Sequence, residues 1–119
     1  MKVAWVVAAA AVLLCSSVAP AFAAFDADEA KRLHELFDRR WEEVARSAPE
    51  WSTFRGDRRY DDRLSDASPE AIAAQDAALR RTLAEARTIR RDRLAPVDQL
   101  SPDLFVDGLE RFEAINRFD

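Results

Sequence analysis

A proline followed directly by an acidic residue occurs three times in the chain, and the recurrence divides the sequence into helical segments. The triplets are Ala48-Pro49-Glu50, Ser68-Pro69-Glu70 and Ser101-Pro102-Asp103. Proline suits the first turn of a helix, where its missing N–H would have no partner, and the helix dipole favours an acid at that end. A serine just before the proline can also cap the helix. Each triplet therefore predicts a helix start.

The residues before the first triplet predict another helix, over positions 26–47. Asp26 can cap its N-terminus, and Glu29, three residues on, can reach back to complete a capping box. Apolar residues then recur every three or four positions, which is the pattern of one helix face. They are Ala30, Leu33, Phe37, Trp41 and Val44. The helix should end before Pro49, because the residue preceding a proline is pushed out of the helical region.

Two further stripes follow the Ser-Pro-acid triplets. The first comprises Ile72, Leu79, Leu83, Ala86 and Ile89 and runs to about Arg91; the second comprises Phe105, Leu109, Phe112 and Ile115. Between Pro49 and Gly56 a short helical turn is expected, ended by glycine in a left-handed conformation. No strand-like alternation is present. The predicted fold class is all-α: a signal peptide, then three main helices and one short helical turn.

The N-terminus has the features of an export signal. Lys2 precedes an apolar run from Val3 to Leu14, and Ala21-Phe22-Ala23 supplies the small residues Ala21 and Ala23 that a signal peptidase prefers. Residues 1–23 are therefore predicted to be a cleaved signal peptide, with an uncleaved membrane anchor as the alternative. We expect a periplasmic or extracellular protein that meets the membrane only through this peptide during export.

Residues 24–119 are expected to form a helical segment of one larger domain, truncated in this chain, because the apolar pattern is still running at Phe118. Cys15 is the only cysteine and would leave with the signal peptide, so no disulfide can form. The net charge of −4 provides no basic footprint for nucleic acid. No nucleic-acid partner is expected.

The single histidine gives a weak metal motif. His34-Glu35-Leu36-Phe37-Asp38 differs from the zinc-protease pattern H-E-x-x-H because Asp38 replaces the second histidine. A catalytic zinc needs three protein ligands, and no downstream residue stands out as the third. We read His34 and Asp38 as solvated. One histidine and two glycines also exclude a Ser-His-Asp triad and a phosphate-cradling loop. The residues therefore predict no catalytic and no metal-binding group.

A second cluster contains acids and arginines in alternation between Gly56 and Asp66. Its acids are Asp57, Asp61, Asp62 and Asp66, and its arginines are Arg58, Arg59 and Arg63. Calcium loops place oxygen ligands at alternate positions around a glycine turn, without interleaved cations. Mutual ion pairing is therefore the preferred interpretation.

The same region carries a resemblance to a known family. The stretches Pro49-Glu50-Trp51, Gly56-Asp57 with Tyr60-Asp61-Asp62-Arg63-Leu64, and Ser68-Pro69-Glu70 opening a helix rich in Ala, Leu and Arg are similar to the N-terminal part of the bacterial family called domain of unknown function 885. The similarity covers nearly all of residues 25–119. Two positions depart from the family pattern: Ala48 replaces a common asparagine, and Arg55 replaces an apolar residue.

The resemblance implies a much longer exported helical protein that acts as a zinc-dependent peptidase. Family members carry an H-E-x-x-P-G-H motif far downstream, and that motif is absent from this sequence. No catalytic residue can be transferred, so this chain by itself is expected to be inactive and to hold no cofactor, with zinc belonging to the full-length protein. Its partners would be the remainder of that protein and, in the intact enzyme, a peptide substrate.

The candidate site is a structural connector composed of Gly56, Asp57, Tyr60, Asp61, Asp62, Arg63 and Leu64. We expect Tyr60 and Leu64 to pack inward, the Tyr60 hydroxyl to pair with a neighbouring aspartate, and the ion pairs to fix the path of the loop. Two functions remain open. The chain is an N-terminal segment of such an enzyme, or it is a free-standing periplasmic helical protein that binds other polypeptides, as a chaperone does.

Overall fold

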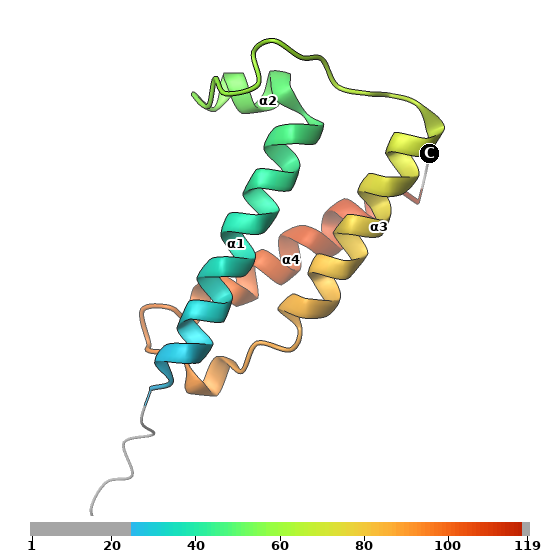
Figure 1. Ribbon diagram of the computed structural model, residues 1–119. Helices are drawn as coiled ribbons and strands as arrows, with labels where there is room; N and C mark the ends of the chain where they lie inside the picture. The colour runs from blue at the N-terminus through green and yellow to red at the C-terminus, as the bar shows by residue number, and fades with distance from the viewer. Residues whose placement is uncertain (1–24, 118–119) are drawn as a thin grey trace, which may run out of the picture.

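The computed structural model describes residues 25–117, and these residues fold into helices joined by turns and one long loop (Figure 1). In chain order the elements are α1 (Ala27–Ser47), α2 (Pro49–Phe54), α3 (Pro69–Ala86), the 3₁₀ turn η1 (Arg91–Arg93) and α4 (Leu100–Ile115). The described part contains no strand. The all-α prediction of three main helices and one short one is confirmed. The predicted signal peptide, residues 1–23, lies outside the described residues.

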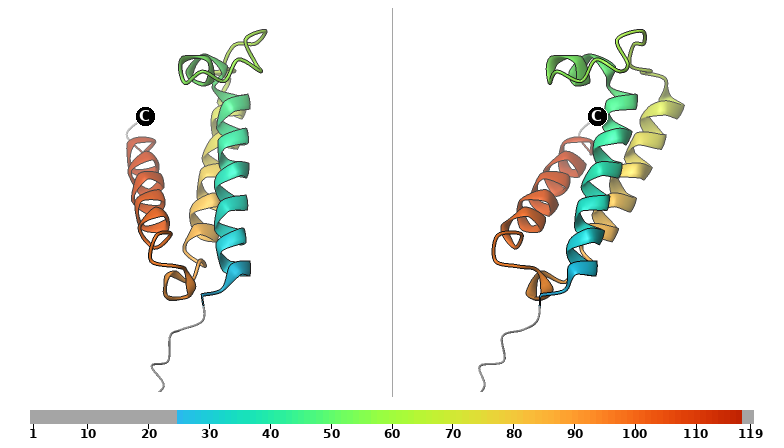
Figure 2. Two further views of the ribbon diagram at one scale, coloured as in Figure 1. Left: turned by 90° about the vertical axis from the view of Figure 1, so that its left-hand side faces the viewer. Right: turned by 60° about the vertical axis from the view of Figure 1, so that its left-hand side comes forward.

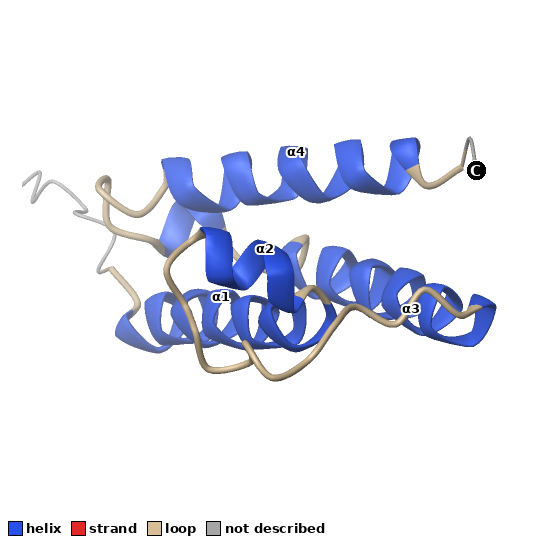
Figure 3. Ribbon diagram, turned by 90° about the horizontal axis from the view of Figure 1, so that it is seen from above, coloured by secondary structure: helices blue, strands red, loops and turns tan. Residues whose placement is uncertain are grey.

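The three long helices form two layers. Helices α1 and α3 lie side by side and run in opposite directions, and α4 crosses them as a second layer (Figures 1 and 3). At one end of this assembly lie α2 and the loop that follows it; at the other end the chain turns through η1 into α4 (Figure 2). This second end is closed by the Asp26 N–H, which donates to the Arg93 carbonyl at 2.8 Å.

The core lies where the two layers meet. Leu36 of α1, three residues of α3 and Leu109 of α4 form its buried cluster, and Ile89, Phe105 and Val106 pack around it. The α3 residues are Leu79, Leu83 and Ala86. Leu33 and Leu94 are completely buried nearby. Burial of these side chains is the main stabilising contribution available to a fold without disulfides.

The N-terminus of α1 begins as predicted but is not a capping box. The Asp26 carboxylate accepts hydrogen bonds from the N–H groups of Asp28 and Glu29, at 3.0 and 3.3 Å. Glu29 does not reach back to Asp26. It is buried, at 6% exposure, and accepts instead from the Arg90 N–H and from Arg32, the latter at 2.9 Å. Glu29 therefore bonds to Arg90 in place of the Asp26 backbone, and this contact connects α1 to the turn before η1.

The apolar stripe predicted for α1 coincides only partly with the residues that are buried. Leu33 is buried as expected, but Trp41 is 36% exposed, while Leu36 and Ala45 are buried although the predicted stripe omitted them. Leu36 lies in the cluster shared with α3 and α4. The buried face therefore includes Leu36, which packs with residues of α3 and α4, while Phe37 contacts Phe105 of α4.

Two helix boundaries differ from prediction. Helix α3 ends at Ala86, not near Arg91, and the turn that follows lets Ile89 pack on the core from outside the helix. Helix α4 begins at Leu100 with Gln99 as its N-cap residue, so Ser101 is not the cap. The Gln99 side chain donates to the Leu94 carbonyl at 2.9 Å and so stabilises the turn that leads into α4.

Gly56 ends the turn after α2 with φ of +92°, in the region that favours glycine, as predicted. Among residues 25–117, none of the helices combines the length and the apolar character required to cross a bilayer.

Candidate functional site

The connector between α2 and α3 begins with a tight junction at Ser52. Ser52 is fully buried; its hydroxyl donates to the Asp57 carbonyl at 3.0 Å, and its carbonyl accepts from the Asp57 N–H at 2.9 Å. Positive φ at Gly56 brings the chain back far enough for both bonds to form. The start of the connector is therefore anchored to α2 by its own backbone.

Tyr60 anchors the middle of the connector to α1. Its hydroxyl donates to the Glu42 carboxylate and accepts from Arg46 Nε at 3.2 Å. Arg46 also donates to Glu42 at 3.0 Å, and Arg59 reaches the same carboxylate at 2.9 Å. We call Glu42, Arg46, Arg59 and Tyr60 the connector clamp.

Ion pairs and hydroxyl contacts fix the rest of the loop. Arg59 forms a bidentate contact with Asp57, with bonds of 2.9 and 2.7 Å, and Arg58 donates to Asp61 at 2.7 Å. Thr53 of α2 donates its hydroxyl to Asp61. Toward α3, the Ser65 N–H donates to the Glu50 carboxylate at 2.9 Å. Such charge-assisted contacts define one path for the loop.

The carboxyl groups of this network favour their ionised forms. Hydrogen bonds from Arg59 lower the pKa of Asp57 from its usual 3.8 to about 2, with a smaller contribution from Trp41. The Tyr60 hydroxyl, followed by Arg59, lowers the pKa of Glu42. The Thr53 hydroxyl and then Arg58 lower the pKa of Asp61. Each shift arises from donors that stabilise the charged form, so the network is intact at neutral pH.

The structure places the predicted connector residues in different environments. The expected arginine–aspartate pairs are present, including a longer contact of 3.8 Å between Arg63 and Asp62. The Tyr60 hydroxyl pairs with Glu42 of α1 and not with a neighbouring aspartate. Leu64 does not pack inward: it is 81% exposed, because the chain beyond Tyr60 runs out toward α3 along the surface.

Sequence analysis did not identify Glu42 as part of the site. Glu42 and Tyr60 are eighteen positions apart, and Glu42 lies among charged residues on a helix face that resembles any solvated surface. The one local signal is the spacing of Glu42 and Arg46, because residues four positions apart on a helix are neighbours. It could identify the ion pair but not the tyrosine.

An aromatic surface adjoins the clamp. The rings of Trp41 and Trp51 lie 5.5 Å apart, and the Arg55 guanidinium lies over the Trp51 ring at 5.2 Å. Trp41 also forms one wall of an apolar groove of about 570 Å³ between α1 and α4. The groove is lined by Phe37, Asp38, Trp41, Ser101, Leu104 and Phe105. Its apolar lining suits a hydrophobic side chain or helix and lacks the convergent polar groups typical of an enzyme site.

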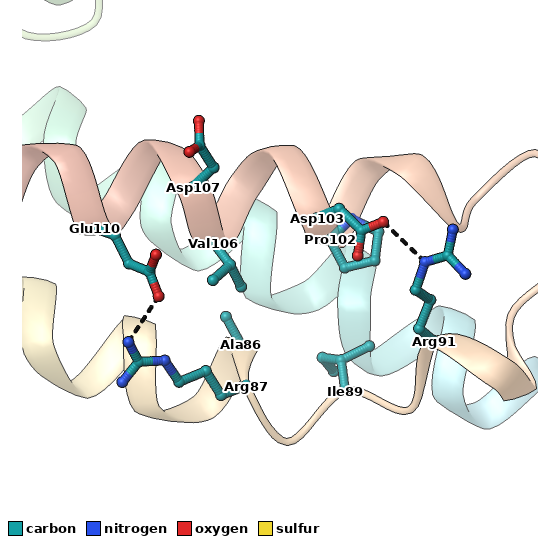
Figure 4. Close-up of a pocket in the computed structure, with 9 residues that line it drawn as sticks. All are labelled: Ala86, Arg87, Ile89, Arg91, Pro102, Asp103, Val106, Asp107 and Glu110. Carbon is teal, nitrogen blue, oxygen red and sulfur yellow. Dashed lines mark hydrogen bonds and ion pairs between the residues drawn. The ribbon is translucent and has the colours of Figure 1, made fainter.

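A second cavity, of about 360 Å³, lies between the end of α3 and α4 (Figure 4). Ile89 and Val106 contribute apolar surface, while two ion pairs bridge the helices beside it: Arg87 to Glu110 at 2.7 Å and Arg91 to Asp103 at 2.8 Å. The third acid of the lining, Asp107, pairs with Arg111 at 2.8 Å, so each of the three acids has an arginine partner. We interpret this cavity as a gap in the packing between α3 and α4.

His34 and Asp38 do not form a metal site. His34 is exposed, and its Nε2 lies 3.7 Å from Asp98 and not against Asp38. Within residues 25–117 no three His, Cys, Asp or Glu side chains converge in a way that could bind a metal ion. The residues that the structure describes therefore do not fit the zinc that the resemblance implies, and no reaction step is assigned to them.

The family is decided by a match over residues 49–117 to the model of "Bacterial protein of unknown function (DUF885)". The chain belongs to this family. No curated protein and no solved structure matches it significantly. The DUF885 match is shorter than the resemblance over residues 25–119, because it begins at Pro49 and leaves α1 outside. The connector lies inside the match, whereas its partners Glu42 and Arg46 come from α1.

Proposed function

We propose that this chain is the N-terminal helical segment of an exported DUF885 protein and that the zinc-dependent peptidase activity belongs to the rest of that protein. In this proposal residues 24–119 supply part of the wall around the substrate cleft. They bind the remainder of the protein through the end of the fold that α2 and the connector form, and they carry out no chemistry themselves.

One observation carries the proposal: α2, the connector and the first turn of α3 expose large apolar side chains at the same end of the fold (Figure 1). Phe54 and Leu64, on either side of the clamp, are 85% and 81% exposed, and Trp51 and Ile72 nearby are 43% and 52% exposed. We call these four residues the apolar end. Large apolar side chains left exposed at one end of a folded protein favour an interaction site there.

Because the clamp fixes the path of the loop, the loop cannot reduce this exposure by rearranging. A mobile loop can turn its apolar residues inward, but here Tyr60, Arg59 and Asp61 are each bound to α1, α2 or the loop itself. Ordering the loop costs conformational entropy before any apolar surface is buried. Covering the apolar end with another part of the protein would bury this surface and add to the stability that the clamp provides.

Export is tested at the N-terminus. The expected result is that the protein recovered from the periplasm or medium begins at Ala24, as determined by N-terminal sequencing. A protein that retains residues 1–23 and remains in the cytoplasm would contradict the export part of the proposal.

Attachment to a larger protein is tested first by reading the coding frame beyond Asp119. We expect it to continue into a metal motif of the H-E-x-x-P-G-H kind. In the protein encoded by the whole frame, replacing Phe54 and Leu64 together by serine should lower thermal stability, while the same change in the 119-residue chain should have little effect on unfolding. Val97→Ser, at the opposite end and 82% exposed, is the matched control and should be neutral in both.

The opposite pattern refutes the proposal. A stop codon after Asp119, together with a serine pair that behaves like Val97→Ser in the encoded protein, would leave the apolar end without a covering partner. Capture of other polypeptides by the wild-type chain, lost in the serine pair, would then identify it as a free-standing binding protein.

A further inference from the structure

Asp38, in the middle of α1, forms neither an ion pair nor a hydrogen bond with any residue between 25 and 117. The basic residues nearest to it in the sequence pair with other acids: His34 with Asp98, Arg39 with Glu85 and Arg40 with Glu43. Asp28 and Glu70 also lack a partner in the described part, but each lies in the first turn of its helix, where the dipole stabilises a negative charge. Asp38 has no such stabilisation.

An aspartate at this position weakens α1. In the interior of a helix aspartate is less favourable than alanine, because its short side chain hydrogen-bonds to the backbone in competing, non-helical conformations. No contact among the described residues offsets this cost at Asp38. The folding of α1 therefore does not require an acid there, whereas binding of a cationic group from outside the chain would.

Asp38 lies on the apolar groove between α1 and α4 and is the one acid among the described residues that line it. None of those residues is a lysine or an arginine. Phe37 and Phe105 meet across the two helices with their ring centroids 4.7 Å apart. Trp41, three positions after Asp38, adds a third ring, which the ring of Trp51 supports at 5.5 Å. The carboxylate is thus bordered by aromatic rings and has no cation beside it.

Aromatic rings and a carboxylate attract the same kind of ligand. The face of a tryptophan or phenylalanine ring binds an ammonium or guanidinium group, and a carboxylate binds either through charge-assisted hydrogen bonds. The apolar lining, including Leu104, suits the alkyl stem that lysine and arginine carry. We propose that this groove binds a lysine or arginine side chain of a peptide from solution, with the cationic head at Asp38 and the stem along Trp41 and Leu104.

Charge favours a basic peptide over a second copy of this chain as the occupant. The chain has a net charge of −4, so two copies repel each other while a basic segment is attracted. The groove volume of about 570 Å³ lies within the range of small-ligand sites, about 300–1,000 Å³, and can hold one long side chain. The inference does not depend on the proposed function, because no residue of the apolar end lines this groove.

An NMR titration of the full chain, purified as the expressing cell processes it, tests the proposal. The probe is a short peptide with blocked ends and an arginine between two leucines, compared with the same peptide carrying citrulline, which has nearly the same shape and no charge. The arginine peptide should shift the Trp41 indole signal and the amide signals of Asp38 and Ser101, with a dissociation constant of roughly 0.1–1 mM, and citrulline should bind about tenfold more weakly.

Two results of this titration overturn the inference. One is the absence of shifts at the groove, or equal binding of the two peptides. The other is a shift of the groove signals with protein concentration alone, which would identify a second copy as the occupant.

Variants of Asp38 test the role of its carboxylate. Asp38→Asn keeps the shape and removes the charge, so the arginine peptide should bind no better than the citrulline peptide. The matched control is Asp28→Asn, the same change on the same helix about 15 Å away along its axis, which should retain the tenfold preference because salt screens charges at that distance.

Asp38→Ala should change stability and binding in opposite directions. The free chain should melt a few degrees higher, because alanine is the better helix former and no contact is lost, while the preference for arginine disappears. A loss of folding cannot imitate this result. If the preference for arginine survives in both Asp38 variants, the proposed site is wrong.

Discussion

Leu109→Ala is the most direct test of how α4 is attached to the rest of the fold. Leu109 is 5% exposed and is the residue that α4 contributes to the buried cluster, where it lies with Leu36, Leu79 and Leu83. Its truncation removes three carbon atoms from the point at which the two helix layers meet. The two layers would then be held mainly by partly buried contacts and by exposed ion pairs, which contribute little.

The expected cost follows from the geometry. Buried Leu→Ala changes cost about 2–5 kcal/mol, and the lower part of that range applies where neighbours can move into the space. Because α4 forms a layer by itself and can shift toward α3, we expect about 2–3 kcal/mol. A domain of this size has roughly 5–10 kcal/mol of stability, so the melting temperature should fall by about 10–20 °C.

Urea unfolding followed by circular dichroism measures this effect. Leu100→Ala is the matched control: the same change on the same helix, at a side chain 61% exposed, should cost less than about 0.5 kcal/mol. Equal effects of the two variants, or a cost below about 0.5 kcal/mol at Leu109, would show that α4 does not pack as described.

Four further predictions concern the loops and turns. Tyr60→Phe removes the hydroxyl that lowers the pKa of Glu42, so an NMR titration should show that pKa rising toward its usual value. Proteolysis of the connector should also become faster. If neither the pKa nor the proteolysis rate changes, the clamp is refuted. The pKa of Asp57 is about 2 in the folded protein against 3.8 ordinarily, so its stabilising contribution is complete above about pH 4 and is lost as pH falls toward 2; acid unfolding of Asp57→Asn should lack this component. Gly56→Ala should destabilise by about 1–2 kcal/mol in thermal melts, since φ of +92° is unfavourable for a residue with a Cβ. Glu29→Ala should cost about 1–3 kcal/mol and accelerate amide exchange in the turn before η1, whereas Glu29→Gln, which retains an acceptor, should cost less.

Local features of the fold could be predicted where the physics itself is local. Asp26 caps α1, proline and acid open α2 and α3, and Gly56 adopts positive φ, because each depends on residues within a few positions. The ion pairs of the connector were predicted for the same reason, since Arg58 and Asp61 are three residues apart. The family resemblance also came from this compact stretch.

Two errors were local, namely the end of α3 and the cap of α4, and two others occurred where a distant residue supplies the partner. Glu29 accepts from Arg90, and Tyr60 pairs with Glu42, although each had a plausible neighbour in the sequence. The local sequence around Glu29 and Tyr60 does not indicate which distant residue lies close to each of them after folding. Leu64 was expected to pack inward because it is apolar, yet the loop fixed by the clamp leaves it outside.

By itself the sequence determined the number of α-helices and where the first three of them begin, because capping, proline geometry and helical periodicity act over a single turn of chain. The motifs around the connector indicated the family, whereas the 3₁₀ turn η1 was not predicted. Only the tertiary structure decided which apolar residues are buried. Helix α4 lies across one part of α1 and leaves Trp41 and its own Phe112 exposed, although their spacing equals that of buried residues. Periodicity defines the face of a helix, but burial depends on what packs against that face.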